Sequence, residues 1–142
     1  MSDPQPDNYS TTALPLKLGI KPEARLALID APDGFTSTLG ELPPGVEVRT
    51  RIRGGFDVIV AFFVARGQLE RRLPALRSAL DQSGGLWLAW PKRTSGVTTD
   101  LEDRIVRELG LAAGLVDNKV CAIDATWSGL RFVYRLADRA RT

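Results

Sequence analysis

The stretch FDVIVAFFV, Phe56–Val64, decides the fold of this chain. Seven consecutive apolar residues run from Val58, and most of them are β-branched or aromatic. A half-exposed strand alternates apolar with polar residues, whereas a strand buried on both faces has a continuous apolar run of this kind. The stretch therefore predicts the central strand of a sheet that is covered on both sides. Its successive residues Phe62 and Phe63 would point to opposite faces.

The sequence after this strand predicts a helix and another strand. Leucines recur at spacings of four, three and four, as on one face of a helix: Leu69, Leu73, Leu76 and Leu80. Pro74 lies within this segment, so the helix is expected to kink or to restart there. Gly84 and Gly85 are expected to end the helical unit, and Leu86–Trp90 predicts the next strand.

The rest of the C-terminal half predicts one further helix and a hairpin. Thr99 and Glu102 match the capping-box spacing and Gly110 is a natural stop, so a helix is expected between them. Val116–Asp124 and Leu130–Leu136 read as two strands joined by a five-residue link. A link of that length allows a hairpin, so the last strand is expected to be antiparallel to its neighbour.

The N-terminal half predicts two short helices and two strands. One helix is expected to end at Gly19, and Phe35–Leu39 predicts a second. Ala24–Asp30 reads as a first strand, and Val46–Arg51 alternates apolar and polar residues like a half-exposed edge strand. Only about five residues join this edge strand to the central one, which is too few for a parallel crossover between full strands. Its pairing direction therefore stays open.

The order of elements predicts the fold class. Strands that alternate with helices are the signature of α/β domains. We expect a three-layer Rossmann-like open sheet, mostly parallel, with a C-terminal antiparallel hairpin. A chain of 142 residues suits one domain. That domain is expected over residues 12–138, between a flexible N-terminal arm (1–11) and a short C-terminal tail (139–142).

The composition excludes several functions. The chain has no histidine, so Ser-His-Asp and Cys-His catalysis are excluded and no metal site is expected. The single cysteine, Cys121, lies in an apolar run and is expected to be a buried, inert thiol. No apolar run is long enough to span a membrane, and the N-terminus lacks the signal-peptide pattern, so a cytoplasmic location is expected. A net charge of +2 disfavours a dedicated nucleic-acid binder.

Two resemblances follow from specific segments. The segment LRSALDQSGGLWLAW, residues 76–90, and the terminal hairpin are similar to parts of the class I methyltransferase fold, of which residues 24–136 resemble a trimmed version. The segments GIKP (19–22), APDGF (31–35), WPK (90–92) and VCAIDATWSGL (120–130) resemble a bacterial family of domains of unknown function. The first resemblance implies a Rossmann-like fold, and the second implies no activity.

The turn after the first strand argues against two common cofactors. S-adenosylmethionine and NAD enzymes are expected to carry a glycine-rich turn there. The turn here, Asp30–Gly34, has one glycine, a proline and two carboxylates that would repel a pyrophosphate. The second strand ends in Arg49-Thr50-Arg51, where an acid for the ribose hydroxyls is expected. The sequence therefore predicts no cofactor and disfavours both S-adenosylmethionine and NAD.

The loops at the carboxyl ends of the strands supply a candidate ligand site, because open α/β sheets bind ligands at this edge. The candidate residues are Asp33, Lys92, Arg93, Ser95, Asp124, Trp127 and Ser128. Lys92 and Arg93 would bind negative charge, and Trp127 would provide a stacking surface. In the alternative interpretation, Asp33 or Asp124 pairs with Lys92 and Trp127 covers the end of the sheet. No residue is assigned a catalytic role.

Three functions stay open on this evidence. The sequence favours a non-catalytic or degenerate Rossmann-like domain that binds a polar or anionic small molecule or a protein partner. The first alternative is a methyltransferase-like enzyme that acts on an anionic substrate through the strand-end loops. The second is weak nucleic-acid binding through exposed arginines, namely Arg49, Arg51, Arg53, Arg135, Arg139 and Arg141. The ligand and the oligomeric state also stay open.

Overall fold

The computed structural model describes residues 12–139, so the expected N-terminal arm and most of the expected C-terminal tail lie outside the described residues. The described chain forms one six-stranded sheet in the order β2-β1-β3-β4-β6-β5. The strands are β1 (Arg25–Ile29), β2 (Glu47–Arg49), β3 (Phe56–Phe62), β4 (Leu80–Pro91), β5 (Leu115–Ala122) and β6 (Trp127–Tyr134). The α-helices are α1 (Leu14–Lys17), α2 (Phe35–Leu39), α3 (Arg66–Ala79) and α4 (Asp103–Ala112).

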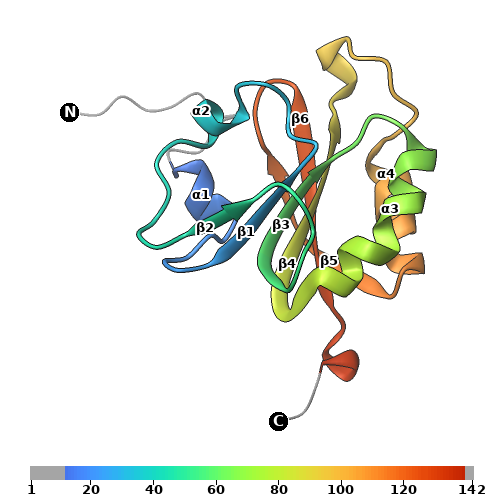
Figure 1. The fold of residues 1–142 in the computed structure, drawn as a ribbon. Coiled ribbons are helices and arrows are strands. Elements are labelled where there is room, and N and C mark those ends of the chain that lie inside the picture. Colours follow the sequence, from blue (N-terminus) through green and yellow to red (C-terminus); the bar gives the residue numbers. More distant parts are fainter. Residues whose placement is uncertain (1–11, 140–142) are drawn as a thin grey trace.

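The sheet confirms the predicted fold class. Strands β2, β1, β3 and β4 pair in parallel, whereas β6 is antiparallel to both β4 and β5. Helices α1 and α2 cover one face, and α3 and α4 cover the other (Figure 1). The chain is therefore a Rossmann-like three-layer α/β domain with a C-terminal antiparallel hairpin.

The pairing direction that the sequence left open is parallel, because β2 is short. It has three residues and pairs with β1, not with β3. Residues 50–55 connect the end of β2 to the start of β3 on the other side of β1. They have to run back over the length of three strand residues and pass across β1. Six extended residues reach roughly 20 Å, and two strand spacings are roughly 10 Å. A crossover without a helix is therefore long enough.

The crossover 50–55 is held against the sheet by one apolar and one basic side chain. Ile52 packs against the core on the face that carries α3 and α4. The guanidinium of Arg25 donates hydrogen bonds to the backbone carbonyls of Gly55 and Arg53, the latter at 3.2 Å. The same guanidinium lies 4.6 Å from the centre of the Phe56 ring. The crossover thus covers the part of the sheet that a helix would otherwise cover.

Two hydrophobic clusters, one on each face of the sheet, form the core. Phe63 belongs to the cluster under α3 and α4, and Phe62 belongs to the cluster under α1 and α2. Both rings are 2% exposed. Trp87 is fully buried beside Phe62, and its indole Nε1 donates a hydrogen bond to the carbonyl of Leu18 at 3.0 Å. The predicted opposite orientation of Phe62 and Phe63 is confirmed.

Truncation of either ring should destabilise the domain. We expect Phe62→Ala and Phe63→Ala each to lower the free energy of unfolding by about 3–5 kcal/mol, because each leaves a cavity in a closed layer. Urea denaturation followed by tryptophan fluorescence measures this loss. A variant that changes the unfolding free energy by less than about 1 kcal/mol would show that its face of the sheet is not packed.

Two predicted breaks between elements are absent from the described residues. Helix α3 runs through Pro74 as one helix, so the restart, one of the two alternatives expected there, does not occur, and the kink stays a prediction. Gly84 and Gly85 do not end the helical unit but lie inside β4, which is longer than predicted. A Cβ atom at Gly84 would lie 2.6 Å from the carbonyl oxygen of Asp57, and one at Gly85 would lie 2.3 Å from Nε of Arg131. These glycines therefore allow close approach of neighbouring groups and are not breakers.

The predicted stop at Gly110 is also wrong. Helix α4 continues past Gly110 to Ala112, and Gly110 is buried in it. A Cβ atom there would lie 2.1 Å from a carbon of the Phe132 ring, which is fully buried. Glycine is therefore required by the close contact between α4 and β6.

Replacing Gly110 with alanine should cost stability despite the better helix propensity of alanine. The gain in propensity is about 1 kcal/mol, whereas overpacking a closed core costs about 1–3 kcal/mol. We expect a net loss of unfolding free energy in chemical denaturation. Gly55→Ala is the matched control, since a Cβ atom at Gly55 meets nothing within 4 Å. Equal stability of the two variants would contradict the close contact.

Candidate functional site

A cavity of about 390 Å³ lies at the carboxyl ends of β1 and β2. The chain passes from β1 to β2 on one side of β1 and then to β3 on the other, so this is the topological switch point of the sheet. Open α/β sheets bind their ligands at such points, and the volume lies in the range of ligand sites. The cavity, called here the switch-point cavity, is lined by Leu28, Asp30, Ala31, Pro32, Gly34, Phe35, Thr36 and Thr50.

The turn after β1 is built from two residues with left-handed backbone. Asp30 has φ of 56° and Gly34 has φ of 81°. A left-handed non-glycine residue is strained, and such strain is concentrated at ligand sites. The Asp30 carboxylate is half exposed and forms an ion pair with Arg72 of α3 at 3.6 Å. The lining thus combines a carboxylate, the hydroxyls of Thr36 and Thr50, and apolar surface.

A second and larger cavity, of about 710 Å³, lies beyond the carboxyl end of β4. This loop cavity is lined by Trp90, Pro91, Lys92, Arg93, residues 97–103, Val120 and Ser128. Trp90 and Leu101 belong to the core under α3 and α4, so the cavity opens on that side of the sheet. Its lining carries both signs of charge, and Arg93 forms an ion pair with Glu102 at 3.6 Å.

The loop before α4 is anchored to the β3–α3 junction. The hydroxyl of Thr99 donates a hydrogen bond to the carbonyl of Val64 at 2.6 Å. A carboxylate oxygen of Asp100 accepts a hydrogen bond from the backbone N–H of Arg66, at the start of α3, at 2.7 Å. Helix α4 begins only after Glu102, which makes no side-chain cap. The predicted capping box is therefore wrong, because α4 begins four residues after Thr99, whose hydroxyl also accepts a hydrogen bond from the N–H of Leu101 at 3.0 Å.

The structure divides the predicted site residues into two groups. Lys92, Arg93 and Ser128 line the loop cavity, whereas Asp33 and Ser95 line neither cavity. Asp33 is exposed. The hydroxyl of Ser95 accepts a hydrogen bond from the N–H of residue 97 at 3.1 Å, which closes the turn of its own loop.

Asp124 lies in the β5–β6 turn and Trp127 is the first residue of β6, and neither lines either cavity. One carboxylate oxygen of Asp124 accepts hydrogen bonds from the backbone N–H groups of Thr126 and Trp127, both at 2.8 Å. The Trp127 ring packs edge-on against Phe62 at 5.1 Å between centroids. No ion pair joins Asp124 to Lys92 among residues 12–139. These two residues therefore hold the hairpin turn against the core.

The sequence reasoning missed Thr50, which lines the switch-point cavity. A signal for it existed in the spacing, because Thr50 lies 20 residues after Asp30 and dinucleotide-binding folds place a ribose ligand at about that distance. Dinucleotide-binding folds carry an acid at that position, whereas this chain carries a hydroxyl. Asp100 and Glu102 of the loop cavity were also missed, since their role as lining residues depends on how the loop folds back.

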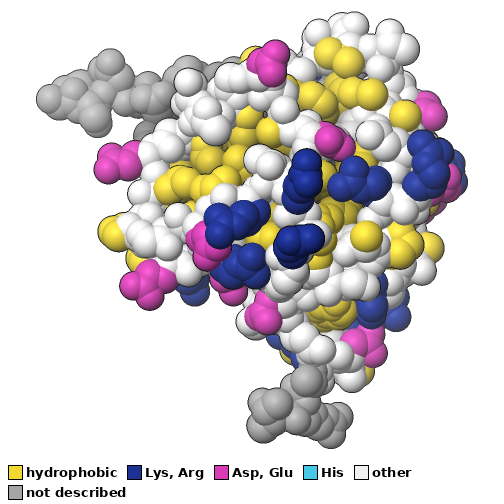
Figure 2. Space-filling view, viewed as in Figure 1, with side chains coloured by type: hydrophobic (Ala, Val, Ile, Leu, Met, Phe, Trp, Pro, Cys, Tyr) yellow, Lys and Arg dark blue, Asp and Glu magenta, His cyan; other side chains and the backbone are white. Residues whose placement is uncertain are grey.

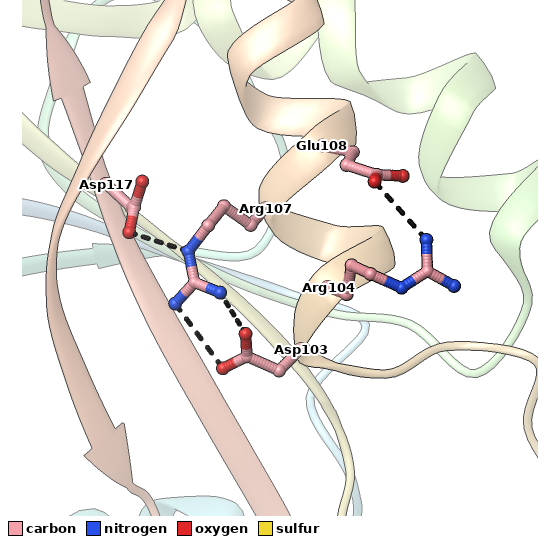
Figure 3. Close-up of polar contacts among 5 residues, drawn as sticks. All are labelled: Asp103, Arg104, Arg107, Glu108 and Asp117. Carbon is pink, nitrogen blue, oxygen red and sulfur yellow. Dashed lines mark hydrogen bonds and ion pairs between the residues drawn. The ribbon is translucent and has the colours of Figure 1, made fainter.

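An ion-pair network on α4 fixes the helix that follows the loop cavity (Figure 3). Arg107 donates to both carboxylate oxygens of Asp103 and, through Nε, to Asp117 of β5 at 3.0 Å. These hydrogen bonds, that with Asp117 first, raise the pKa of the Arg107 guanidinium. One turn away, Arg104 and Glu108 form a pair within the helix at 3.3 Å. Arg107 thus connects α4 to the hairpin.

This connection predicts a measurable coupling. In a double-mutant cycle of Arg107→Gln and Asp117→Asn, we expect a coupling energy of about 0.2–1 kcal/mol, since both groups are partly exposed. The cycle of Arg104→Gln and Glu108→Gln, which stays within α4, should give about 0.3–0.5 kcal/mol. Urea denaturation at low and high salt measures both. No coupling between Arg107 and Asp117 at low salt would mean that the network does not tie α4 to β5.

Other kinds of site find little support in the described part of the chain. Burial raises the pKa of the Cys121 thiol, which is 7% exposed. Among residues 12–139, no three acidic or cysteine side chains are grouped as metal ligands. In the same range, no helix has the length and apolar character needed to cross a membrane.

The comparisons with known proteins reveal similarity of structure without similarity of sequence. No protein-family model matches the chain, and no curated protein sequence matches it. The resemblance to a bacterial family of domains of unknown function therefore stays a prediction.

Several solved structures that match the fold are described as methyltransferases or as complexes with SAM or SAH. A methyltransferase from Aquifex aeolicus described as SAM-dependent shares 12% identity, with 82% of this chain and 85% of that chain covered and a TM-score of 0.61. A complex of DhpI with SAH shares 12% identity, with 87% and 83% covered and a TM-score of 0.60. Magnesium protoporphyrin IX methyltransferase from Synechocystis, with bound SAM, shares 10% identity, with 86% and 74% covered and a TM-score of 0.56. The trimmed methyltransferase-like fold is thus confirmed.

These neighbours overturn the expectation against S-adenosylmethionine, since several of them contain SAM or SAH. The sequence argument took the two carboxylates of the Asp30–Gly34 turn as repelling a pyrophosphate. S-adenosylmethionine has no phosphate, and its sulfonium and ammonium groups are cations that a carboxylate attracts. The turn also needs no second glycine, because Asp30 itself adopts the left-handed backbone.

Proposed function

We propose that this chain is a methyltransferase-like domain that binds S-adenosylmethionine in the switch-point cavity. The observation that carries the proposal is the juxtaposition of Asp30, at the end of β1, and Thr50, just after β2, around one cavity at the switch point. The fold shared with methyltransferases supports it.

The residues of the cavity match the chemical groups of the proposed cofactor. The Asp30 carboxylate would balance its positive charge, since an opposite charge at close range favours binding. The hydroxyls of Thr36 and Thr50 can each donate and accept hydrogen bonds, as ribose hydroxyls require. Leu28 and Phe35 provide apolar surface for a flat base. S-adenosylmethionine supplies an electrophilic methyl group when it is bound.

The loop cavity is the proposed place for a methyl acceptor with an anionic group. Arg93 already pairs with Glu102, whereas Lys92 is half-buried, and its ammonium has no ion-pair partner among the described residues. The Lys92 ammonium would therefore bind the anionic group of the acceptor. The apolar lining from Trp90 and Leu101 would hold the rest of the molecule. A non-catalytic domain would also bind S-adenosylmethionine in the switch-point cavity, but it would bind no methyl acceptor.

The cofactor proposal predicts a thermal shift. At an excess of about 100 dissociation constants, S-adenosylmethionine should add about 2.7 kcal/mol to the stability of the wild-type protein. That gain should raise Tm by several degrees. Differential scanning fluorimetry measures the shift, and isothermal titration calorimetry measures Kd.

Matched variants locate the site. Asp30→Asn should weaken binding about tenfold or more, because it removes a charge-assisted contact. Asp33→Asn, in the same turn but outside the cavity, should bind like the wild type. No saturable shift with S-adenosylmethionine would refute the proposal. Equal losses in the two variants would instead place Asp33 on the ligand, as the sequence predicted.

A further inference from the structure

The crossover between β2 and β3 presents a row of arginines to solvent. Arg49, Arg51 and Arg53 alternate with Thr50 and Ile52. The side chain of Ile52 packs against the core, whereas Arg49, Arg51 and Arg53 are exposed. The arginines are therefore turned outward. Figure 2 shows basic side chains gathered in the middle of this face of the molecule.

The row borders a concave surface. A cavity of about 600 Å³ is lined by Arg25, Arg49, Thr50, Arg51, Ile52 and Arg53. Four of these six residues carry a guanidinium. The cavity, called here the arginine cavity, does not belong to the loop cavity or the switch-point cavity. Thr50 nevertheless lines both the arginine cavity and the switch-point cavity, so the two are neighbours.

The positive charge of the arginine cavity is only partly balanced. Glu47 forms ion pairs with Arg49 and with Arg25, the latter at 3.8 Å. The side chains of Arg51 and Arg53 make no ion pair or hydrogen bond with any residue between 12 and 139. Among the described residues, one carboxylate thus pairs with two of the four guanidinium groups, and the other two have no ion-pair partner. Like charges that lie close together repel, so an anion that enters the cavity relieves this repulsion.

We propose that the arginine cavity binds the phosphate groups of a ligand. Guanidinium groups present paired N–H donors that match phosphate oxygens in a bidentate way, and clustered arginines are the usual means of phosphate recognition. Arg25 is already fixed by its bonds to the crossover carbonyls and by the Phe56 ring, so it is preorganised. The phosphates belong either to a small phosphorylated molecule or to the backbone of a nucleic acid.

The position beside Thr50 places the bound phosphates next to the switch-point cavity. Phosphate binding does not require the cofactor proposal, and it is tested without S-adenosylmethionine. Two probes distinguish the sources: inorganic pyrophosphate, measured by isothermal titration calorimetry, and a fluorescein-labelled oligouridine, measured by anisotropy at low salt. Tighter binding of pyrophosphate identifies a small phosphorylated ligand. Tighter binding of the oligonucleotide identifies a nucleic-acid backbone.

The decisive variants remove two charges each. Arg51→Gln/Arg53→Gln should weaken the tighter probe tenfold or more, and for the oligonucleotide it should reduce the log–log salt slope by about 1.4. Neither side chain has an ion pair or hydrogen bond to lose among residues 12–139, and both are exposed, so the fold should be retained. The control Arg104→Gln/Lys119→Gln lowers the net charge equally, at α4 and at the edge strand β5 on the opposite side of the sheet from β2, and should leave affinity within twofold.

A third variant tests the charge balance from the other side. Glu47→Gln removes the competing carboxylate and should tighten binding severalfold, with circular dichroism as the check on folding. Failure of both probes to bind the wild-type protein would overturn the proposal. So would equal losses in the crossover and control variants, since the binding would then follow net charge alone.

Discussion

Burial of β3 on both faces is the constraint on which the rest of the structure depends. Its apolar side chains alternate between two clusters, so each face of the sheet has to be closed by other parts of the chain. Helices α3 and α4 close one side, and α1 and α2 close the other (Figure 1). At roughly 1.5–3 kcal/mol for each large side chain buried, a core of this kind supplies the main term of stability. The loops at the carboxyl ends of the strands are therefore held in place by the packed sheet and its helices, which together form a rigid frame.

The two cavities beside β1 and β2 result from how the chain passes between the strands. Because β2 is short and pairs with β1, the sheet reverses its order beside β1, and Asp30 and Thr50 are brought to one cavity. Because the return to β3 needs no helix, its outer side is left free to carry arginines. The same short strand thus creates both the switch-point cavity and the arginine cavity. The cavities share Thr50 for this reason.

The sequence predicted the layers and strands well, because the apolar period of a buried strand or helix is a local property. The sequence-based predictions were wrong at residues whose role depends on contacts with distant segments of the chain. Gly110 reads as a helix stop, yet it is glycine because Phe132 of β6 lies against it. Thr99 reads as a helix cap, yet the helix begins only at Asp103, and the Thr99 hydroxyl joins the loop to Val64. Asp124 and Trp127 were grouped with Lys92 by their position at one sheet edge. The backbone does bring the two loops together, since the N–H of Lys92 donates a hydrogen bond to the carbonyl of Thr126 at 2.7 Å, but local turn bonds and core packing direct the side chains of Asp124 and Trp127 elsewhere.

The crossover 50–55 also has a consequence for the dynamics of the domain. A helix in this place would hold its own backbone by internal hydrogen bonds, whereas the carbonyls of Arg53 and Gly55 are held by one side chain, that of Arg25. Local opening of this segment has to break only those bonds and the packing of Ile52. Segments of this kind exchange their amide protons through local fluctuations, not through global unfolding. Evolution can therefore change the reach and composition of this loop while the six-stranded frame stays folded.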